Sequence, residues 1–532
     1  MVAKSDSHNR GVHGSAMSPR ISLCMIVRDN EAILGECLRS IRPWVDEMIV
    51  VDTGSRDATT RIAAEAGALV SESPWKDSFA EARNASIARA TGDWIFWMDS
   101  DDVIDPQNGR RLRSLLEHER PADLLGFVMQ VHCPGAGGAA SGDVTVVDHI
   151  KLFRNRADLR FEGRIHEQIL PAIRRAGGEV AWTDVHVVHK HGSVTAAARA
   201  GKHARDLRLL ELEHRDVGEH PFVLFNLGMT YCDMDRHQEA TEHLERCLLA
   251  STANESHLSK AYSLLVACHL KLERFERAEA ISREAVTRFP DDPETLFRHA
   301  LCAHHAGRHR DSIACYRQIL AATTETPERK RHTFSSGDAG IGGHKARHNL
   351  AAVLADVGRL AEAEAELRIA LDEAPHFQAA LAALGSLLIR QKKFVTARLQ
   401  ARHWLRQSAT KPAGMVLAAE IAEAEGRSGE AIEMFESLRA EFPNSEQGLD
   451  ELARLYFASE RWNDAEIVLR ELNRRRPVSA GLAHNLGAAL LANGKISEAT
   501  EWLQKSLELR PHFSPTRALW EQAVSQESHA NS

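Results

Sequence analysis

A small residue recurs every 34 positions through the second half of this 532-residue chain. The step from Ser312 to Ala363 is longer, at 51 residues, and a stretch rich in Thr, Gly, Ser and charge lies between them at about 323–343. A fixed period of this length is typical of stacked units of supersecondary structure, interrupted here by one loop insertion. The series is Ala240, Ala278, Ser312, Ala363, Ala397, Ala431, Ala465 and Ala499, with a four-residue insertion near 253–256.

Prolines and glycines keep the same register. A proline follows the small residue by 12 positions in five places, and a glycine precedes it by 12 positions in three. The small residue lets two helices approach closely, and the proline ends the second helix. The pattern predicts about eight helix-turn-helix units over 221–525, closed by a capping helix. They resemble tetratricopeptide repeats, which implies a solenoid that binds a protein or peptide acceptor or partner. The markers are Pro290, Pro375, Pro443, Pro477, Pro511, Gly228, Gly385 and Gly487.

The first part of the chain has a different periodicity. Short apolar runs at 21–27, 48–51, 68–70 and 94–98 alternate with helical patterns at about 31–41, 57–66 and 79–90. This alternation predicts an α/β domain over 21–200 with a mostly parallel sheet. In such sheets ligands bind beyond the carboxyl ends of the strands. We expect a disordered leader at 1–20, a helical linker at 201–220 and a tail at 526–532.

Three carboxylates follow the fourth predicted strand directly, at Asp99, Asp101 and Asp102. Their mutual repulsion is relieved by a hard divalent cation, and such a cation can bridge the phosphates of a nucleotide diphosphate. The alternative interpretation is a solvated acidic turn that caps the helix near Asp105.

Polar residues also follow the first two predicted strands. Arg28, Asn30 and Glu31 follow the first, and Asp52 and Gly54 follow the second. Asp52 is placed to accept hydrogen bonds from a uracil base or a ribose, and Gly54 permits a tight turn. For the nearby aspartate at position 57, the favoured role is capping the next helix.

Five motifs give residues 21 to about 195 a resemblance to family 2 glycosyltransferases of the GT-A, Rossmann-like fold. The similarity is greatest to the branch with the SunS-type peptide glycosyltransferases and the WaaE-type glucosyltransferases. That family usually carries Glu where Asp102 stands, so the carboxylate is kept with a shorter reach. The motifs are Met25–Glu31, Val51–Asp57, Phe79–Asn84, Trp94–Asp102 and Phe161–Glu167.

The resemblance implies a nucleotide-diphosphate sugar donor, with a UDP-sugar expected, a Mg or Mn ion, and inversion at the anomeric carbon. Glu167 is then the candidate base, with His166 beside it, and the alternative is a surface residue on a helix at about 165–174. The short basic strand at Lys151 to Arg154 either lines the phosphate or acceptor side or is purely structural. The implied nucleotide-sugar-binding residues are Arg28, Asn30, Glu31, Asp52, Gly54, Arg83, Asn84 and Asp99. The implied metal ligands are Asp99, Asp101, Asp102 and either His189 or His191.

Composition narrows the class of protein further. A net charge of -8 and a pI near 6.4 argue against a nucleic-acid-binding protein. No apolar run approaches the roughly 18 residues of a transmembrane segment, and the first twenty residues lack the apolar stretch of a secretory signal. Eight cysteines without metal-binding spacing suit reduced thiols in the cytoplasm. The competing hypothesis is a repeat scaffold that carries a degenerate transferase domain, and the intact acidic cluster argues against it.

Overall fold

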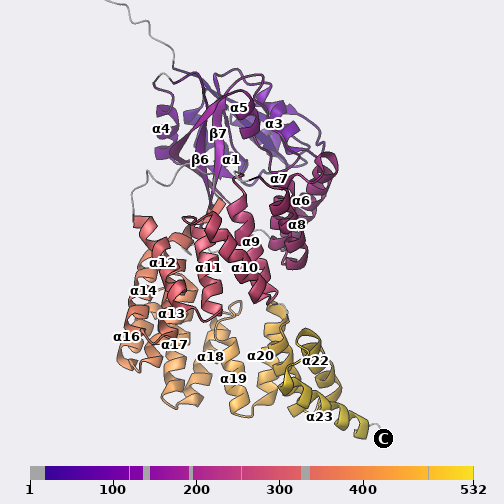
Figure 1. The fold of residues 1–532 in the computed structure, drawn as a ribbon, viewed down its shortest axis with the longest axis vertical. Coiled ribbons are helices and arrows are strands. Elements are labelled where there is room, and N and C mark those ends of the chain that lie inside the picture. Colours follow the sequence, from indigo (N-terminus) through magenta and orange to yellow (C-terminus); the bar gives the residue numbers. More distant parts are fainter. Residues whose placement is uncertain are drawn as a thin grey trace, which may run out of the picture. The chain divides into compact units, whose positions relative to one another are not determined.

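The computed structural model describes residues 18–118, 120–135, 144–190, 196–252, 255–324, 336–476 and 478–530. The chain forms two compact units, Met1–Val353 and Leu354–Ser532. Figure 1 shows the strands and helices of the chain, coloured along the sequence. Among the helices so described, none is long and apolar enough to cross a membrane.

The first unit contains a mixed sheet, with nine strands in the described ranges, in the order β3-β2-β1-β4-β7-β6-β8-β5 with β9 beside β7. β1 runs parallel to β2 and β4, as the sequence predicts, and β6 and β8 are also parallel. β7 runs antiparallel to β4 and β6, so the α/β prediction is confirmed but the sheet is less parallel than expected. The strands are β1 Ile21–Val27, β2 Glu47–Asp52, β3 Leu69–Glu72, β4 Trp94–Trp97, β5 Asp102–Val103, β6 Leu124–Pro134, β7 Val144–Arg154, β8 Glu179–His189 and β9 Ser336–Asp338.

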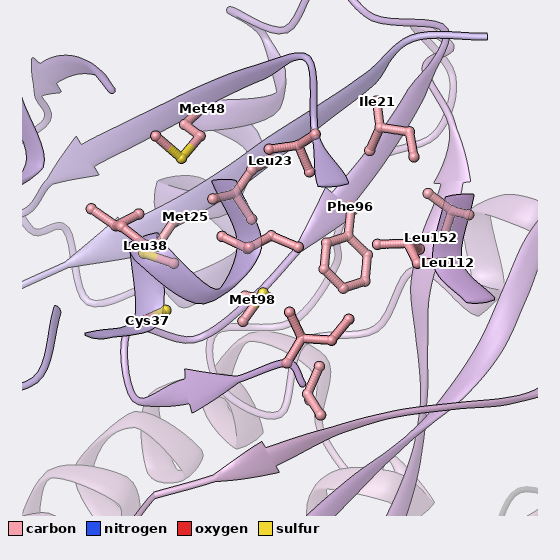
Figure 2. Close-up of a cluster of buried hydrophobic side chains, with 14 of the residues drawn as sticks. Ile21, Leu23, Met25, Cys37, Leu38, Met48, Phe96, Met98, Leu112 and Leu152 are labelled. Atoms are coloured by element: carbon pink, nitrogen blue, oxygen red, sulfur yellow. The ribbon is translucent and has the colours of Figure 1, made fainter. Parts of the chain in front are cut away.

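Both faces of the central strands are buried, which explains their continuous apolar sequences. One face packs Leu23, Met25 and Phe96 against Leu38 (Figure 2). The opposite face packs the alternate residues, including Trp97 at the end of β4. The helices around the sheet are α1 Leu34–Ile41, α2 Thr59–Glu65, α3 Phe79–Ile87, α4 Pro106–Ser114 and α5 Leu170–Arg175, with a 3-10 turn η1 at Arg42–Trp44.

Helix α6, Ala196–Val217, covers most of the segment predicted as a linker, 201–220, and packs on the α/β domain. Arg208 pairs with Asp77 before α3, and Arg164 pairs with Asp216. Apolar residues of α6 join the same small core as residues from the first repeat helix. The helix therefore belongs to the body of the first unit.

The repeat prediction is confirmed: in the described ranges sixteen helices follow α6 in the pattern of eight pairs, and α23 comes last. All eight small residues of the sequence pattern are fully buried. The four described prolines each stand two residues after a helix end, and Pro477 lies outside the described residues. The helices are α7 Pro221–Asp233, α8 His237–Ala250, α9 Leu258–Lys271, α10 Phe275–Arg288, α11 Pro293–His305, α12 His309–Thr324, α13 His344–Asp356, α14 Leu360–Glu373, α15 Gln378–Arg390, α16 Phe394–Leu405, α17 Lys411–Ala424, α18 Ser428–Glu441, α19 Leu449–Ala458, α20 Trp462–Arg475, α21 Ala480–Ala492, α22 Ile496–Leu509 and α23 Ser514–Ala530.

The loop insertion lies between α12 and α13. Its described part holds β9 and a 3-10 turn, η4 Ala339–Gly342. β9 pairs antiparallel with the first half of β7, where Asp338 lies opposite Thr145. The insertion thus adds a strand to the sheet of the α/β domain.

Candidate active site

The acidic run forms a tight turn between β4 and β5. The Asp102 N–H donates to the Asp99 carbonyl at 3.1 Å, and the Asp99 N–H donates to Asp102 Oδ2 at 3.2 Å. β5 pairs with β8 so that Asp102 lies opposite His189. This pairing brings a histidine from a distant segment next to two aspartates: His189 Nδ1 is 2.9 Å from Asp102 Oδ1 and 3.3 Å from Asp101 Oδ1.

Asp101, Asp102 and His189 can together hold a cation, because each offers a ligand atom within 4.8 Å of the other two. Carboxylate oxygens are the ligands that Mg and Mn prefer. Asp99, expected as a further ligand, stands outside this group, and His191 lies outside the described residues. The alternative of a solvated acidic turn holds only in part: Asp105 does cap α4, and the side chains of Asp99 and Asp101 are 39% and 28% exposed, but Asp102 is fully buried.

Lys151 neutralises the buried Asp102. Its Nζ lies 2.8 Å from Asp102 Oδ2, and both side chains are almost completely inaccessible, at 1% and 0% exposure. Burial opposes ionisation of Asp102, but Lys151 and His189 outweigh it and lower the Asp102 pKa. Asp101 has no such lysine, and burial together with the charges of Asp99 and Asp102 raises its pKa to about 6. Of the two basic residues in the predicted strand, Lys151 pairs with the acidic turn, whereas Arg154 donates to the Leu124 carbonyl.

Arg83 links the acidic turn to the candidate base. Its Nη2 donates to Asp99 Oδ1 at 2.7 Å, and its Nε donates to Glu167 Oε1. Burial disfavours the ionised form of Asp99, but the charges of Arg83 and Lys151 lower its pKa overall. The third guanidinium nitrogen, Nη1, is buried and has no hydrogen-bond partner among the described residues.

Glu167 does not lie on the expected helix, because α5 begins only at Leu170. It follows His166, which adopts φ +53°, in a loop closed by a bridge between Glu162 and Gln168. The Glu167 side chain is only 9% exposed, so the surface-residue alternative is wrong. Burial lowers the pKa of His166, which favours the neutral imidazole.

Asn84 is committed to backbone contacts. Its side-chain amide donates to the Phe161 carbonyl at 2.9 Å and accepts from the Phe161 N–H at 2.9 Å. These two hydrogen bonds connect α3 to the segment that begins at Phe161 and contains Glu167. Asn84, expected on the donor side, thus fixes the loop that carries the candidate base.

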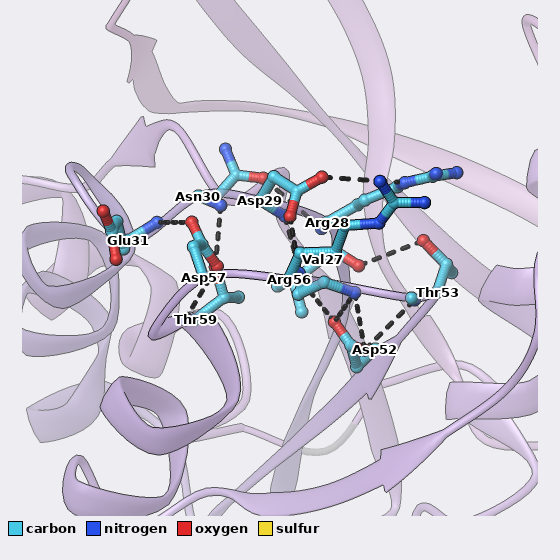
Figure 3. A network of polar contacts seen from close by, with 12 residues as sticks. Val27, Arg28, Asp29, Asn30, Glu31, Asp52, Thr53, Arg56, Asp57 and Thr59 are labelled. Atoms are coloured by element: carbon cyan, nitrogen blue, oxygen red, sulfur yellow. Dashed lines mark hydrogen bonds and ion pairs between the residues drawn. The ribbon is translucent and has the colours of Figure 1, made fainter.

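Five of the eight expected nucleotide-sugar-binding residues belong to one network on the loops after β1 and β2 (Figure 3), namely Arg28, Asn30, Glu31, Asp52 and Gly54. The Asp52 carboxylate accepts from the N–H groups of Gly54 and Ser55, and Gly54 has φ +114°, which favours glycine. The Glu31 N–H donates to the Asp57 carboxylate at 3.0 Å. The two loops are therefore locked together.

The same network orders the rest of the first loop. Asn30 accepts from the Arg28 N–H through Oδ1, and its own N–H donates to Thr59 Oγ1 at 2.7 Å. Asp57 accepts from the Thr59 N–H at the start of α2, close to its predicted capping role, although Ala58 is the N-cap residue.

The contacts of Trp97 were not predicted from the sequence. Its ring lies under two cations, with Arg83 Cζ at 4.2 Å and Lys151 Nζ at 3.8 Å from the ring centroid. The available signal was Lys151, an ionisable residue inside the apolar run Ile150–Phe153. A lysine in a buried strand needs a charged partner, so its position indicated a buried ion pair nearby.

Comparison with known proteins identifies both parts of the chain. Residues 22–141 match the model for glycosyl transferase family 2. Tetratricopeptide repeat models match 221–291, 269–339, 348–412, 422–489 and 479–510. The chain thus joins a domain of glycosyl transferase family 2 to an array of tetratricopeptide repeats.

Curated relatives support this assignment. A TPR repeat-containing protein of Synechococcus elongatus is 44% identical over 156 residues, which is 29% of this chain and 36% of that protein. The SPbeta prophage-derived glycosyltransferase SunS of Bacillus subtilis is 24% identical over 266 residues, 48% of this chain and 60% of SunS. The chain therefore spans between about a third and three fifths of the length of these relatives.

Solved structures resemble the chain only weakly. The pilus biogenesis factor PilW is 22% identical and covers 42% of this chain and 95% of its own, with a TM-score of 0.34. A tetratricopeptide repeat protein of Parabacteroides merdae is 16% identical and covers 50% of this chain and 98% of its own, with a TM-score of 0.32. These TM-scores are too low to show a shared overall fold.

Proposed function

We propose that the protein is a metal-dependent glycosyltransferase that moves a sugar from a nucleotide diphosphate to a protein, peptide or glycan acceptor, with inversion at the anomeric carbon. A UDP-sugar is the expected donor. The observation that carries the proposal is the linkage of the acidic turn, Glu167 and His189 through Arg83 and the β5–β8 pairing. The family 2 match and the likeness to the glycosyltransferase SunS support it.

Asp101 and His189, with Asp102 beside them, would hold the Mg or Mn ion. When bound, the cation would offset the negative charge that develops on the departing nucleotide diphosphate. Lys151 already pairs with Asp102 Oδ2. Asp101 has no such lysine partner among the described residues, so its negative charge would be compensated most by the cation.

We assign the nucleotide to the two loops that follow β1 and β2. Their polar groups bond to one another, so the loops present a fixed surface to a base and ribose. Asp52 holds the turn at Gly54, and Glu31 holds the start of α2 through the Ala58 N–H at 3.0 Å. A fixed surface loses little freedom on binding, which favours affinity.

Glu167 would take the proton from the acceptor hydroxyl. Arg83 occupies its Oε1, and no donor among the described residues reaches Oε2, so that oxygen suits a general base. The unpartnered Nη1 of Arg83 suits a phosphate or sugar oxygen close to Glu167.

Hydrolysis of a panel of nucleotide sugars, with Mn present, tests this assignment. We expect Glu167→Gln to retain binding of UDP and Mn and to lose about 10²–10⁴ in turnover, because the amide cannot accept the proton. Glu162→Gln is the matched control: this exposed glutamate of the same loop pairs with Arg175 and should leave turnover unchanged. Equal rates for Glu167→Gln and wild type would place the base elsewhere.

A further inference from the structure

Trp97, the last residue of β4, lies at the centre of the charged side chains in the site. It is buried, at 6% exposure, and its Nε1 donates to the Ile150 carbonyl at 2.7 Å, so the ring orientation is fixed. Arg83 and Lys151 both lie over this ring, at 4.2 and 3.8 Å from its centroid. Both faces of an indole ring are negative, so a desolvated cation against either face is attracted to it.

Each of these cations holds a different part of the site. Arg83 holds Asp99 and Glu167, and Lys151 holds Asp102. Asp102 in turn holds the ring of His189. Arg83 thus joins the acidic turn to the candidate base, and Trp97 contacts both this arginine and the lysine that pairs with Asp102.

We infer that Trp97 is a positioning residue, which fixes Arg83 and Lys151 and through them both the cation-holding acids and the base. The inference rests on the proposed function. Its physical basis is that long basic side chains have many rotamers, and a rigid aromatic surface selects one of them. Without the ring, Arg83 and Lys151 keep their acidic partners but lose the aromatic contact that restricts their rotamers.

Trp94 is the matched control. It lies on the same strand and is also buried, at 2% exposure, but its side chain packs on the opposite face of the sheet. It too has a cation on its ring, Arg154 at 4.8 Å, and that arginine donates to the Leu124 carbonyl. Its replacement thus removes an indole and one cation contact without touching the acids.

Calorimetry with UDP and Mn, together with kcat and KM for nucleotide-sugar hydrolysis, compares Trp97→Leu, Trp97→Phe and Trp94→Leu. We expect Trp97→Leu to weaken Mn-dependent UDP binding about tenfold and to lower kcat, because both cations lose their aromatic contact. Trp97→Phe should recover part of both losses, since a phenyl ring still offers a face. Equal effects of Trp97→Leu and Trp94→Leu would overturn the inference.

A stability cycle of Trp97→Leu and Lys151→Met gives a readout that is independent of catalysis. We expect the two changes to be non-additive in denaturant unfolding, since each removes the same contact. Additive effects would overturn the positioning role. Absence of UDP binding in the wild-type protein, by contrast, would overturn the proposed function and with it the functional part of this inference.

Discussion

Replacement of Lys151 by methionine tests how much the buried ion pair between Lys151 and Asp102 contributes to the free energy of unfolding. The ammonium of Lys151 and the carboxylate of Asp102 are 2.8 Å apart with side chains 1% and 0% exposed. Removing one member of a buried pair typically costs about 3–5 kcal/mol, because the other charge remains uncompensated. Methionine fills most of the space, and His189 still holds the second oxygen. We therefore expect the lower end, a loss of about 3 kcal/mol in the free energy of unfolding.

Guanidinium unfolding at pH 7, followed by tryptophan fluorescence, measures this loss. Lys190→Met is the control, since Lys190 pairs with Glu36 at the surface with about half of each side chain exposed. An exposed pair contributes about 0–1 kcal/mol. The double variant Lys151→Met with Asp102→Asn should recover much of the loss. Equal costs for Lys151→Met and Lys190→Met would refute the reasoning.

Two further predictions concern the repeats. Gly487→Ala should lower the stability measured by thermal unfolding by about 1–3 kcal/mol, because a Cβ at this position lies 2.7 Å from a leucine of the facing helix. Gly481→Ala on the same helix is the control: a Cβ there meets no other atom, and the change should stabilise the protein by up to about 1 kcal/mol. Burial, then Glu451 and Glu423, raise the pKa of Glu420 from 4.5 to about 7, so folding favours its protonated form and stability falls as pH rises from 4.5 through 7. Glu420→Gln should therefore raise the Tm at pH 8 and leave it unchanged at pH 4.5, and the reverse order would contradict this.

The repeat array was predictable because its signals are local and repeated. A buried Ala431 or Ala465 marks the same helix contact in every unit, so position alone identifies it. The parallel strands β1, β2 and β4 were predictable for a similar reason, since a strand buried on both faces is apolar throughout. β6 was not predicted, because Gly126, Gln130 and His132 interrupt its apolar sequence.

The residues of the candidate site were predictable from the sequence, but the contacts between them were not. The acidic turn and Glu167 stand out as motifs. By contrast, the Arg83 bridge joins residues 84 positions apart, and the Lys151–Asp102 pair joins residues 49 apart. Such pairs depend on which strands become neighbours, and no local pattern encodes that. The same limit explains why Asn84, expected at the donor, instead holds the Phe161 backbone.

We propose that the acidic turn holds a divalent cation together with a nucleotide diphosphate. Titration of UDP into the wild-type protein and into Asp101→Ala, each with and without Mn, tests it most directly. We expect Mn-dependent binding by the wild-type protein and its loss in Asp101→Ala, with an unchanged circular dichroism spectrum. UDP binding that is the same in both proteins, or that does not depend on Mn, would contradict the account.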